Sequence, residues 1–124
     1  MDKKGVTLIE LIIVVAIIGI LAAIAVPAYL GQQKAAARTE AYSNLQNLRL
    51  LEEQFFAENG AYTASAANVA AIQALLPGFR PGTGLNFNYA ITVTPPCFVA
   101  TATGTGARVA GDVFTIDCNN NRNF

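Results

Sequence analysis

One carboxylate, Glu10, interrupts a long apolar run that extends from Val6 to Leu30. Acidic side chains inside an apolar helix are costly and usually mark a pairing or transport function. No basic side chain lies inside the run, so the nearest candidate partner is an α-amino group. Cleavage after Gly5 would create that group on Val6, about one helical turn from Glu10. The residue types and their spacing therefore predict an amine–carboxylate pair at one end of the apolar run.

An amine and a carboxylate at the same end of one apolar helix compensate each other poorly. They are compensated when neighbouring helices are staggered, so that the carboxylate of one copy meets the amine of another. Because a buried charge without its partner is costly, such a pair fixes the register between helices. The alternative is that Glu10, which lies near the end of the run, simply reaches the lipid headgroups.

The element that positions Glu10 is predicted to be a membrane-spanning helix. The segment Leu11–Val26 carries no charge and no hydroxyl, and its flanks extend the apolar character to roughly the 20 residues that cross a bilayer. In lipid every backbone polar group must be satisfied internally, which requires a helix. Lys3 and Lys4 on the short N-terminal side predict a cytoplasmic N-terminus, with the rest of the chain across the membrane.

A secretory signal peptide and a simple N-terminal anchor are alternative interpretations of the same run. The residues Val26-Pro27-Ala28 could imitate a signal-peptidase site. However, a run of this length with an internal acid is atypical of a signal peptide. A simple anchor has no use for a carboxylate at Glu10.

The run is predicted to continue into an amphipathic helix, because Ala35–Glu58 contains no proline and no glycine. Apolar residues recur there at three- and four-residue steps and form one stripe: Ala41, Leu45, Leu48, Leu51 and Phe55. The charged side chains are expected to lie mostly off this stripe: Lys34, Arg38, Arg49, Glu52, Glu53 and Glu58. Asn59-Gly60 is a favourable helix stop. These patterns predict a single helix of about 50 residues whose second half packs against a globular domain.

The remaining sequence predicts a short helix over Ala66–Leu76 and a small sheet. Alternating apolar and polar residues favour three strands: Phe87–Thr94, Phe98–Thr103 and Val113–Cys118. Short neighbouring strands of this kind favour an antiparallel meander. The predicted fold class is α+β, with a long N-terminal helix packed on an antiparallel sheet of three to four strands. The tail Asn119–Phe124 is predicted to be mobile because it is polar.

Cys97 and Cys118 are the only cysteines, and both lie on the translocated side of the predicted membrane helix, where disulfides form. A disulfide between them would stabilise the domain by about 3 kcal/mol in the chain-entropy model. A pair of free thiols in the core is the alternative. The sequence has no C-x-x-C spacing, so redox catalysis is not indicated.

The composition offers no set of residues for catalysis or metal binding. Histidine is absent, and Asp112 and Asp117 are the only aspartates after Gly5, too sparse for a calcium loop. Cleavage after Gly5 would leave a nearly neutral chain without a basic patch for nucleic acid. We therefore expect no enzymatic activity, no cofactor, no metal and no specific nucleic-acid binding.

The stretch Lys4-Gly5-Val6-Thr7-Leu8-Ile9-Glu10, with the apolar run and Pro27 behind it, resembles the class III signal of type IV pilins, and is most similar to the type IVa group. The resemblance is strong over residues 4 to about 62 and weak beyond. In that family a membrane prepilin peptidase cuts after the glycine and methylates the new terminal amine. The resemblance therefore implies cleavage after Gly5 and an N-methylated Val6. Phenylalanine is the usual family residue at that place, so Val6 is a departure.

The resemblance also implies roles for residues inside the chain. Glu10 matches the assembly glutamate of the family, and Thr7 is assigned to assembly with it. The segment between Gly19 and Pro27 is expected to lose helicity in a filament but not in the bilayer, where unpaired backbone groups would be severely penalised. The pair Cys97–Cys118 is expected to bound the disulfide-closed C-terminal region of the family.

The sequence thus predicts a structural subunit that polymerises into a type IV pilus filament, with Glu10 pairing to the Val6 amine of a neighbouring copy. The expected organisation is a leader over 1–5, a membrane and filament-core helix over 6–30, and a globular domain over 31–124. Expected partners are further copies of the chain, the prepilin peptidase, the inner-membrane assembly machinery and, before assembly, membrane lipid. The chain is expected in the inner membrane first and in an extracellular pilus afterwards.

Three other functions share much of this pattern. A minor pilin would prime or modify the filament with the same N-terminal segment. A type II secretion pseudopilin is disfavoured by the cysteine pair and by the lack of an acid-rich calcium loop. A monomeric membrane-anchored binding domain would form no filament and would leave Glu10 dispensable.

Overall fold

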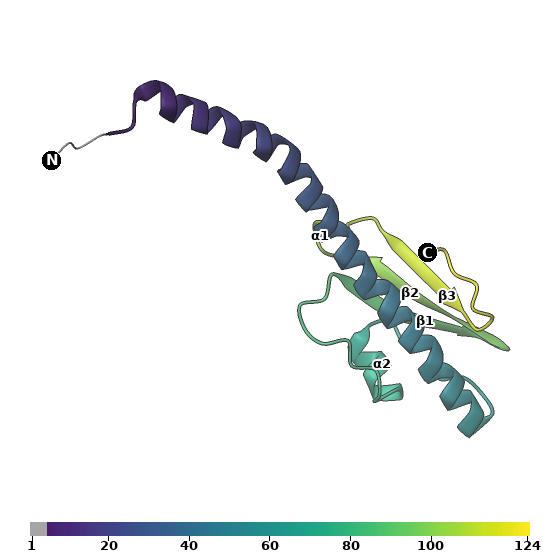
Figure 1. The fold of residues 1–124 in the computed structure, drawn as a ribbon. Coiled ribbons are helices and arrows are strands. Elements are labelled where there is room, and N and C mark those ends of the chain that lie inside the picture. The colour runs from purple at the N-terminus through teal and green to yellow at the C-terminus, as the bar shows by residue number, and fades with distance from the viewer. Residues whose placement is uncertain (1–4) are drawn as a thin grey trace. The chain divides into compact units, whose positions relative to one another are not determined.

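The structure, a computed structural model, describes residues 5–124, so most of the expected leader, residues 1–4, lies outside it. A long helix, α1 (Leu8–Asn59), is followed by a short helix, α2 (Val69–Leu75), and three strands (Figure 1). The strands are β1 (Phe87–Thr94), β2 (Cys97–Gly104) and β3 (Val113–Asp117). The chain divides into two compact units, Met1–Gln33 and Lys34–Phe124, and α1 contributes to both.

The sheet of the second unit is a three-stranded antiparallel meander in the order β1-β2-β3. Because side chains alternate across a strand, one face of the sheet is apolar. That inward face carries buried residues from all three strands: Phe87, Tyr89, Ile91, Phe98, Ala100, Ala102 and Ile116. The expected α+β class and all three expected strands are confirmed, with bounds that differ by one residue at most.

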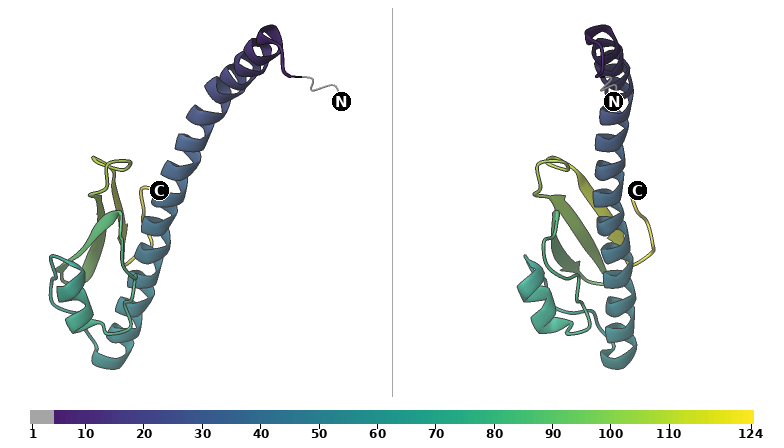
Figure 2. Two further views of the ribbon diagram at one scale, coloured as in Figure 1. Left: turned by 90° about the vertical axis from the view of Figure 1, so that its left-hand side faces the viewer. Right: turned by 60° about the vertical axis from the view of Figure 1, so that its left-hand side comes forward.

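The second half of α1 packs its apolar stripe against this inward face (Figures 1 and 2). Ala41, Leu45 and Leu48 are fully buried, while Leu51 and Phe55 are partly buried at the edge of the core. The helix ends before Gly60, whose positive φ of 74° is the left-handed conformation that glycine accepts after a last turn. The predicted single long helix is therefore confirmed.

Glu52 departs from the expectation that the charged residues of α1 lie mostly off the buried stripe. Glu52 is completely buried. Its carboxylate accepts hydrogen bonds from the backbone N–H of Thr63 at 3.2 Å and from the Thr63 hydroxyl. The helical spacing from Leu45 and Leu48 puts Glu52 on the same face. A polar partner in the segment after α1 makes this burial tolerable, and that partner is not visible in the helix pattern alone.

The tail after β3 also differs from the prediction, because it pairs with the sheet. The backbone of Arg122 forms a bridge with Ile116, and the Asn123 side chain bonds the backbone of Thr115 and Val113 at 2.8 and 3.0 Å. The ring of Phe124 stacks on Tyr42 of α1 with centroids 4.8 Å apart. The tail therefore covers the β3 edge, which would otherwise expose unpaired backbone groups.

Two smaller features complete the second unit. A disulfide joins Cys97 at the start of β2 to Cys118 just after β3, which confirms the pair expected from the sequence. The short helix α2 begins later than the predicted Ala66–Leu76, because Asn68 acts as its N-cap and accepts a hydrogen bond from the Ala71 N–H at 2.9 Å.

Candidate assembly site

Thr7 and Glu10 form a reciprocal cap at the start of α1. The Thr7 N–H donates to Glu10 Oε2 at 2.9 Å, and the Glu10 N–H donates to Thr7 Oγ1 at 3.2 Å. This is the capping box, in which two backbone donors at a helix start are satisfied by two side chains. The assembly role predicted for Thr7 and Glu10 did not include this cap, although the Thr-x-x-Glu spacing is its recognised sequence signal.

The cap fixes the direction and the hydrogen-bonding state of the Glu10 carboxylate. Oε2 is held by Thr7, whereas within residues 5–124 no hydrogen bond engages Oε1. Both Gly5 and Val6 precede the helix and are exposed, with Val6 exposing 75% of its surface. The predicted cleavage position is thus accessible in this chain, and one carboxylate oxygen can accept a further donor.

The apolar run that follows Glu10 is helical and exposed along its length. The large apolar side chains in Leu8–Leu30 all expose half or more of their surface. This part of α1 is long and apolar enough to cross a membrane. Exposed apolar surface on this scale marks a membrane or protein interaction site.

Gly19 and Pro27 both lie inside the continuous helix α1. Proline has no amide hydrogen, so the carbonyl of Ala23 lacks its usual helical donor. Glycine costs about 1 kcal/mol relative to alanine in a helix interior. The segment between these residues is therefore helical, but its helix is less stable than the rest of the apolar run.

In the second unit, an ion pair attaches the β2–β3 loop to α1. Arg38 Nε donates to Asp112 Oδ2 at 2.8 Å, and Arg38 Nη2 donates to Oδ1 at 3.2 Å. The hydrogen-bonded Arg38 guanidinium holds the pKa of Asp112 below its usual value, and Asp112 raises the pKa of Arg38. The bidentate geometry fixes where the loop lies on the helix.

A second polar cluster attaches the start of the sheet to the same helix. The Tyr89 hydroxyl donates to Glu40 Oε2 at 3.0 Å and accepts from Asn44 Nδ2 at 2.9 Å. The Asn86 N–H donates to the Glu40 carboxylate at 3.2 Å. Burial raises the pKa of Tyr89 well above its usual value, so the hydroxyl stays protonated and keeps donating. Sequence reasoning missed both clusters, because their partners are distant in the chain.

The remaining predicted site residues do not form a reactive centre. Among residues 5–124 there is no cluster of three or more histidine, cysteine, aspartate or glutamate side chains that could hold a metal ion. Both cysteines are joined in the disulfide at the far end of the sequence from Glu10. The chemistry that this arrangement supports at Glu10 is ion pairing, and the exposed apolar helix supports association.

Two family profiles match the chain and together cover nearly all of it. The profile described as "Prokaryotic N-terminal methylation motif" matches residues 1–26. The profile described as "Type IV minor pilin ComP, DNA uptake sequence receptor" matches residues 27–122.

Curated relatives match both the N-terminal segment and the globular unit. The chain is 36% identical over 123 residues to the "Type IV major pilin protein PilA" of Myxococcus xanthus, covering 98% of this chain and 50% of the relative. It is 39% identical over 71 residues to the "Type IV wide pilus major component PilA4" of Thermus thermophilus, covering 57% and 54%. The chain spans about half the length of the curated relatives it matches. No solved structure matches it significantly.

Proposed function

The chain belongs to the type IV pilin family, and on that premise we propose that it is a structural subunit that polymerises into a pilus filament through its N-terminal helix. The observation that carries the proposal is the Glu10 carboxylate, which the Thr7 cap holds at the start of an exposed apolar helix. A carboxylate in that place needs a cation, and a long exposed apolar surface needs a non-aqueous environment.

Processing supplies the cation. The prepilin peptidase would cut the exposed bond after Gly5 and methylate the new amine of Val6, which remains positively charged. Cleavage leaves the Thr7 N–H in place, so the cap on Glu10 can persist in the mature chain. Glu10 Oε1 would then accept a charge-assisted hydrogen bond from the Val6 amine of a neighbouring copy.

Assembly moves the apolar helix from lipid into a bundle of identical helices. Before assembly the segment anchors the chain in the inner membrane, with the N-terminus in the cytoplasm and the globular unit across the membrane. The assembly machinery then transfers the subunit to the base of the filament. A contact between different surfaces of identical copies, repeated with a displacement along the axis, generates an open filament rather than a closed dimer.

We further propose that α1 loses helicity between Gly19 and Pro27 when the subunit enters the filament. Pro27 already leaves one carbonyl without a helical donor, and Gly19 weakens the helix. In lipid the backbone must stay internally bonded, so the segment remains helical there. In a filament, local unwinding would let the apolar part and the globular part adapt to different packing.

The test separates the charge of Glu10 from its capping role. Glu10→Ala removes both, whereas Glu10→Gln removes the charge but keeps a side chain that can complete a capping box. In a pilus-competent host that lacks its own pilin, both variants should be processed, yet neither should form normal filaments. Processing is read from the subunit mass, and assembly from electron microscopy of sheared filaments. Normal filaments from Glu10→Gln would rule out the ion pair.

A minor pilin is the second candidate, because the profile over residues 27–122 is described as a minor pilin and a receptor for DNA. The charge distribution gives this candidate limited support: Arg38 is paired with Asp112, whereas Arg80 and Arg108 are exposed. Quantitative mass spectrometry of purified filaments distinguishes the two, since a major subunit would dominate the protein content. A minor subunit that binds DNA would instead be scarce, and its DNA affinity would fall steeply with salt.

A further inference from the structure

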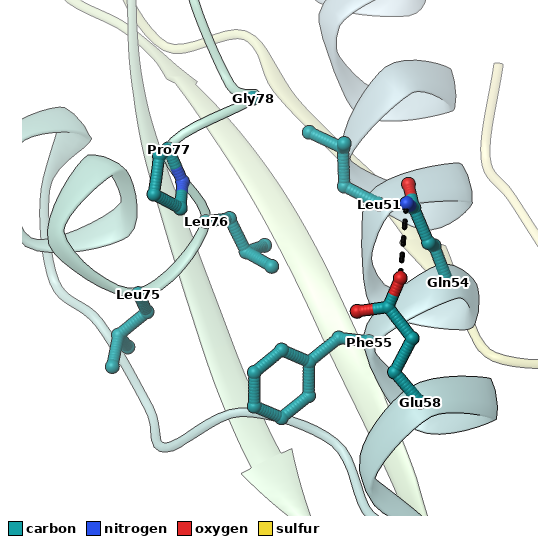
Figure 3. A pocket seen from close by; sticks show the side chains of 8 residues that line it. All are labelled: Leu51, Gln54, Phe55, Glu58, Leu75, Leu76, Pro77 and Gly78. Atoms are coloured by element: carbon teal, nitrogen blue, oxygen red, sulfur yellow. Dashed lines mark hydrogen bonds between the residues drawn. The ribbon is translucent and has the colours of Figure 1, made fainter.

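A cleft of about 210 Å³ lies between the last turns of α1 and the segment that follows α2 (Figure 3). The apolar part of its lining comes from Leu51 and Phe55 on α1 and from Leu75, Leu76 and Pro77 opposite them. Its polar part comes from Gln54 and Glu58, and Gln54 Nε2 donates a hydrogen bond to Glu58 Oε1 at 3.3 Å. A cleft that combines apolar side chains with one carboxylate suits a long basic side chain, which packs its aliphatic stem on the apolar part and presents a cation at the end.

Glu58 is poorly placed for the stability of its own helix. It lies in the last turn of α1, where the helix carries partial negative charge and where this helix has no basic residue. A cation that entered the cleft would interact favourably with both the carboxylate and the helix end. The local charge therefore favours a basic occupant over an apolar or acidic one.

Arg108 is a free basic side chain held on a rigid loop at the other end of the globular unit. It is exposed, and within residues 5–124 no hydrogen bond or ion pair engages it. The loop is fixed by the buried Val109, by the Asp112 N–H bond to Val109 O at 2.9 Å, and by the Arg38–Asp112 pair. The fixed loop holds the backbone of Arg108 in place, so binding would have to order only its side chain.

We propose that, in the filament, Arg108 of one copy enters the Glu58 cleft of another copy. Asp112 holds the loop against Arg38, near the beginning of the globular unit, whereas Glu58 lies about 30 Å further along the helix at 1.5 Å per residue. A single chain cannot bridge that separation. Parallel copies displaced along the helix direction by a similar distance bring the two ends together.

The same stagger selects Arg108 over another exposed arginine. Arg80 follows Gly78 of the cleft wall by two residues, so it belongs to the cleft end of the globular unit. Parallel copies displaced along the helix bring opposite ends of their globular units together. Arg80 and the Glu58 cleft lie at the same end, so this displacement does not bring Arg80 of one copy to the cleft of another. The Arg108–Glu58 contact is heterologous and repeats along the filament, as the proposed N-terminal pairing does.

The inference rests on the proposed filament function, and a charge-swap experiment tests the two separately. Purified filaments of Arg108→Glu and of Glu58→Arg should release subunits roughly fivefold faster than wild type on heating. Each variant replaces the attraction between opposite charges with a repulsion between like charges, and exposed ion pairs contribute on this scale. The double variant Arg108→Glu with Glu58→Arg should recover most of the wild-type rate. Arg122→Glu is the control, because it makes the same charge reversal at an arginine of the C-terminal tail. Its filaments should release subunits at about the wild-type rate.

Cysteine cross-linking tests the contact directly. Gln54 lines the cleft and Ala107 precedes Arg108, and both are exposed. Oxidised filaments of the Gln54→Cys with Ala107→Cys variant should give a ladder of covalent oligomers on a non-reducing gel, and neither single variant should. If filaments form but give no ladder, or if the double charge-swap variant does not recover the wild-type release rate, this contact is refuted. The proposed filament function is not refuted by either result. A wild-type chain that forms no filament would refute the proposed function, and this contact with it.

Discussion

Replacing Thr63 by valine would test the burial of Glu52. Valine keeps the branched shape of threonine but removes the hydroxyl that donates to the Glu52 carboxylate. The carboxylate would then keep only the Thr63 backbone N–H, at 3.2 Å. Because Glu52 is completely buried, water cannot replace the lost donor, and the expected loss is about 2 kcal/mol of unfolding free energy.

The loss should be large enough to measure by thermal unfolding. For a globular unit of this size, 1 kcal/mol shifts the unfolding midpoint by roughly 4–8 °C, so Thr63→Val should lower Tm by about 8–16 °C. The assay is far-ultraviolet circular dichroism of the full chain in detergent. Thr63→Ser keeps the hydroxyl and should retain most of the stability.

Thr92→Val is the matched control, because it makes the same change at an exposed position of β1. It should alter Tm little. If Thr63→Val shifts Tm no further than Thr92→Val, the hydroxyl contributes nothing and the reasoning is refuted. Combining Thr63→Val with Glu52→Leu should recover part of the loss, since removing both polar partners leaves no unsatisfied group.

Three further predictions concern the pH response, the disulfide and processing. Arg38 lowers the pKa of Asp112, so this pair stabilises the fold above the ordinary carboxyl pKa of about 4 and its contribution disappears as the pH falls through the lowered value. Asp112→Asn should therefore weaken the dependence of Tm on pH below about pH 4. Reducing the Cys97–Cys118 disulfide should lower the unfolding free energy by about 3 kcal/mol, measured by urea unfolding with and without reductant. Gly5→Asp should leave the precursor uncut in the membrane fraction, and an N-terminal sequence that begins at Val6 would contradict this.

The regular elements could be predicted from the sequence because their signals are local. The stripe Ala41, Leu45 and Leu48 defines one face of α1, and the stop at Asn59-Gly60 defines its end. Alternation over Phe87–Thr94 gives β1 without any knowledge of its partners. The position of Glu10 in the apolar run was visible for the same reason.

The polar contacts could not be predicted in this way, because they join residues far apart in the chain. Arg38 and Asp112 are ordinary charged residues until the fold brings them together. Composition also misled the prediction of the tail: Asn123 is polar, but its amide replaces a neighbouring strand for β3, and Phe124 finds an aromatic partner in Tyr42. The Thr7–Glu10 cap is the exception, since its spacing was readable and was overlooked.

In the proposed filament, Glu10 pairs with the processed N-terminus of another copy. Electron cryo-microscopy of the purified native filament would test it directly, combined with the mass of its subunit. We expect a subunit that begins at a methylated Val6, with the Glu10 carboxylate within about 4 Å of the Val6 nitrogen of a neighbouring copy. A filament held together by the globular units alone, with Glu10 facing no amine, would contradict it.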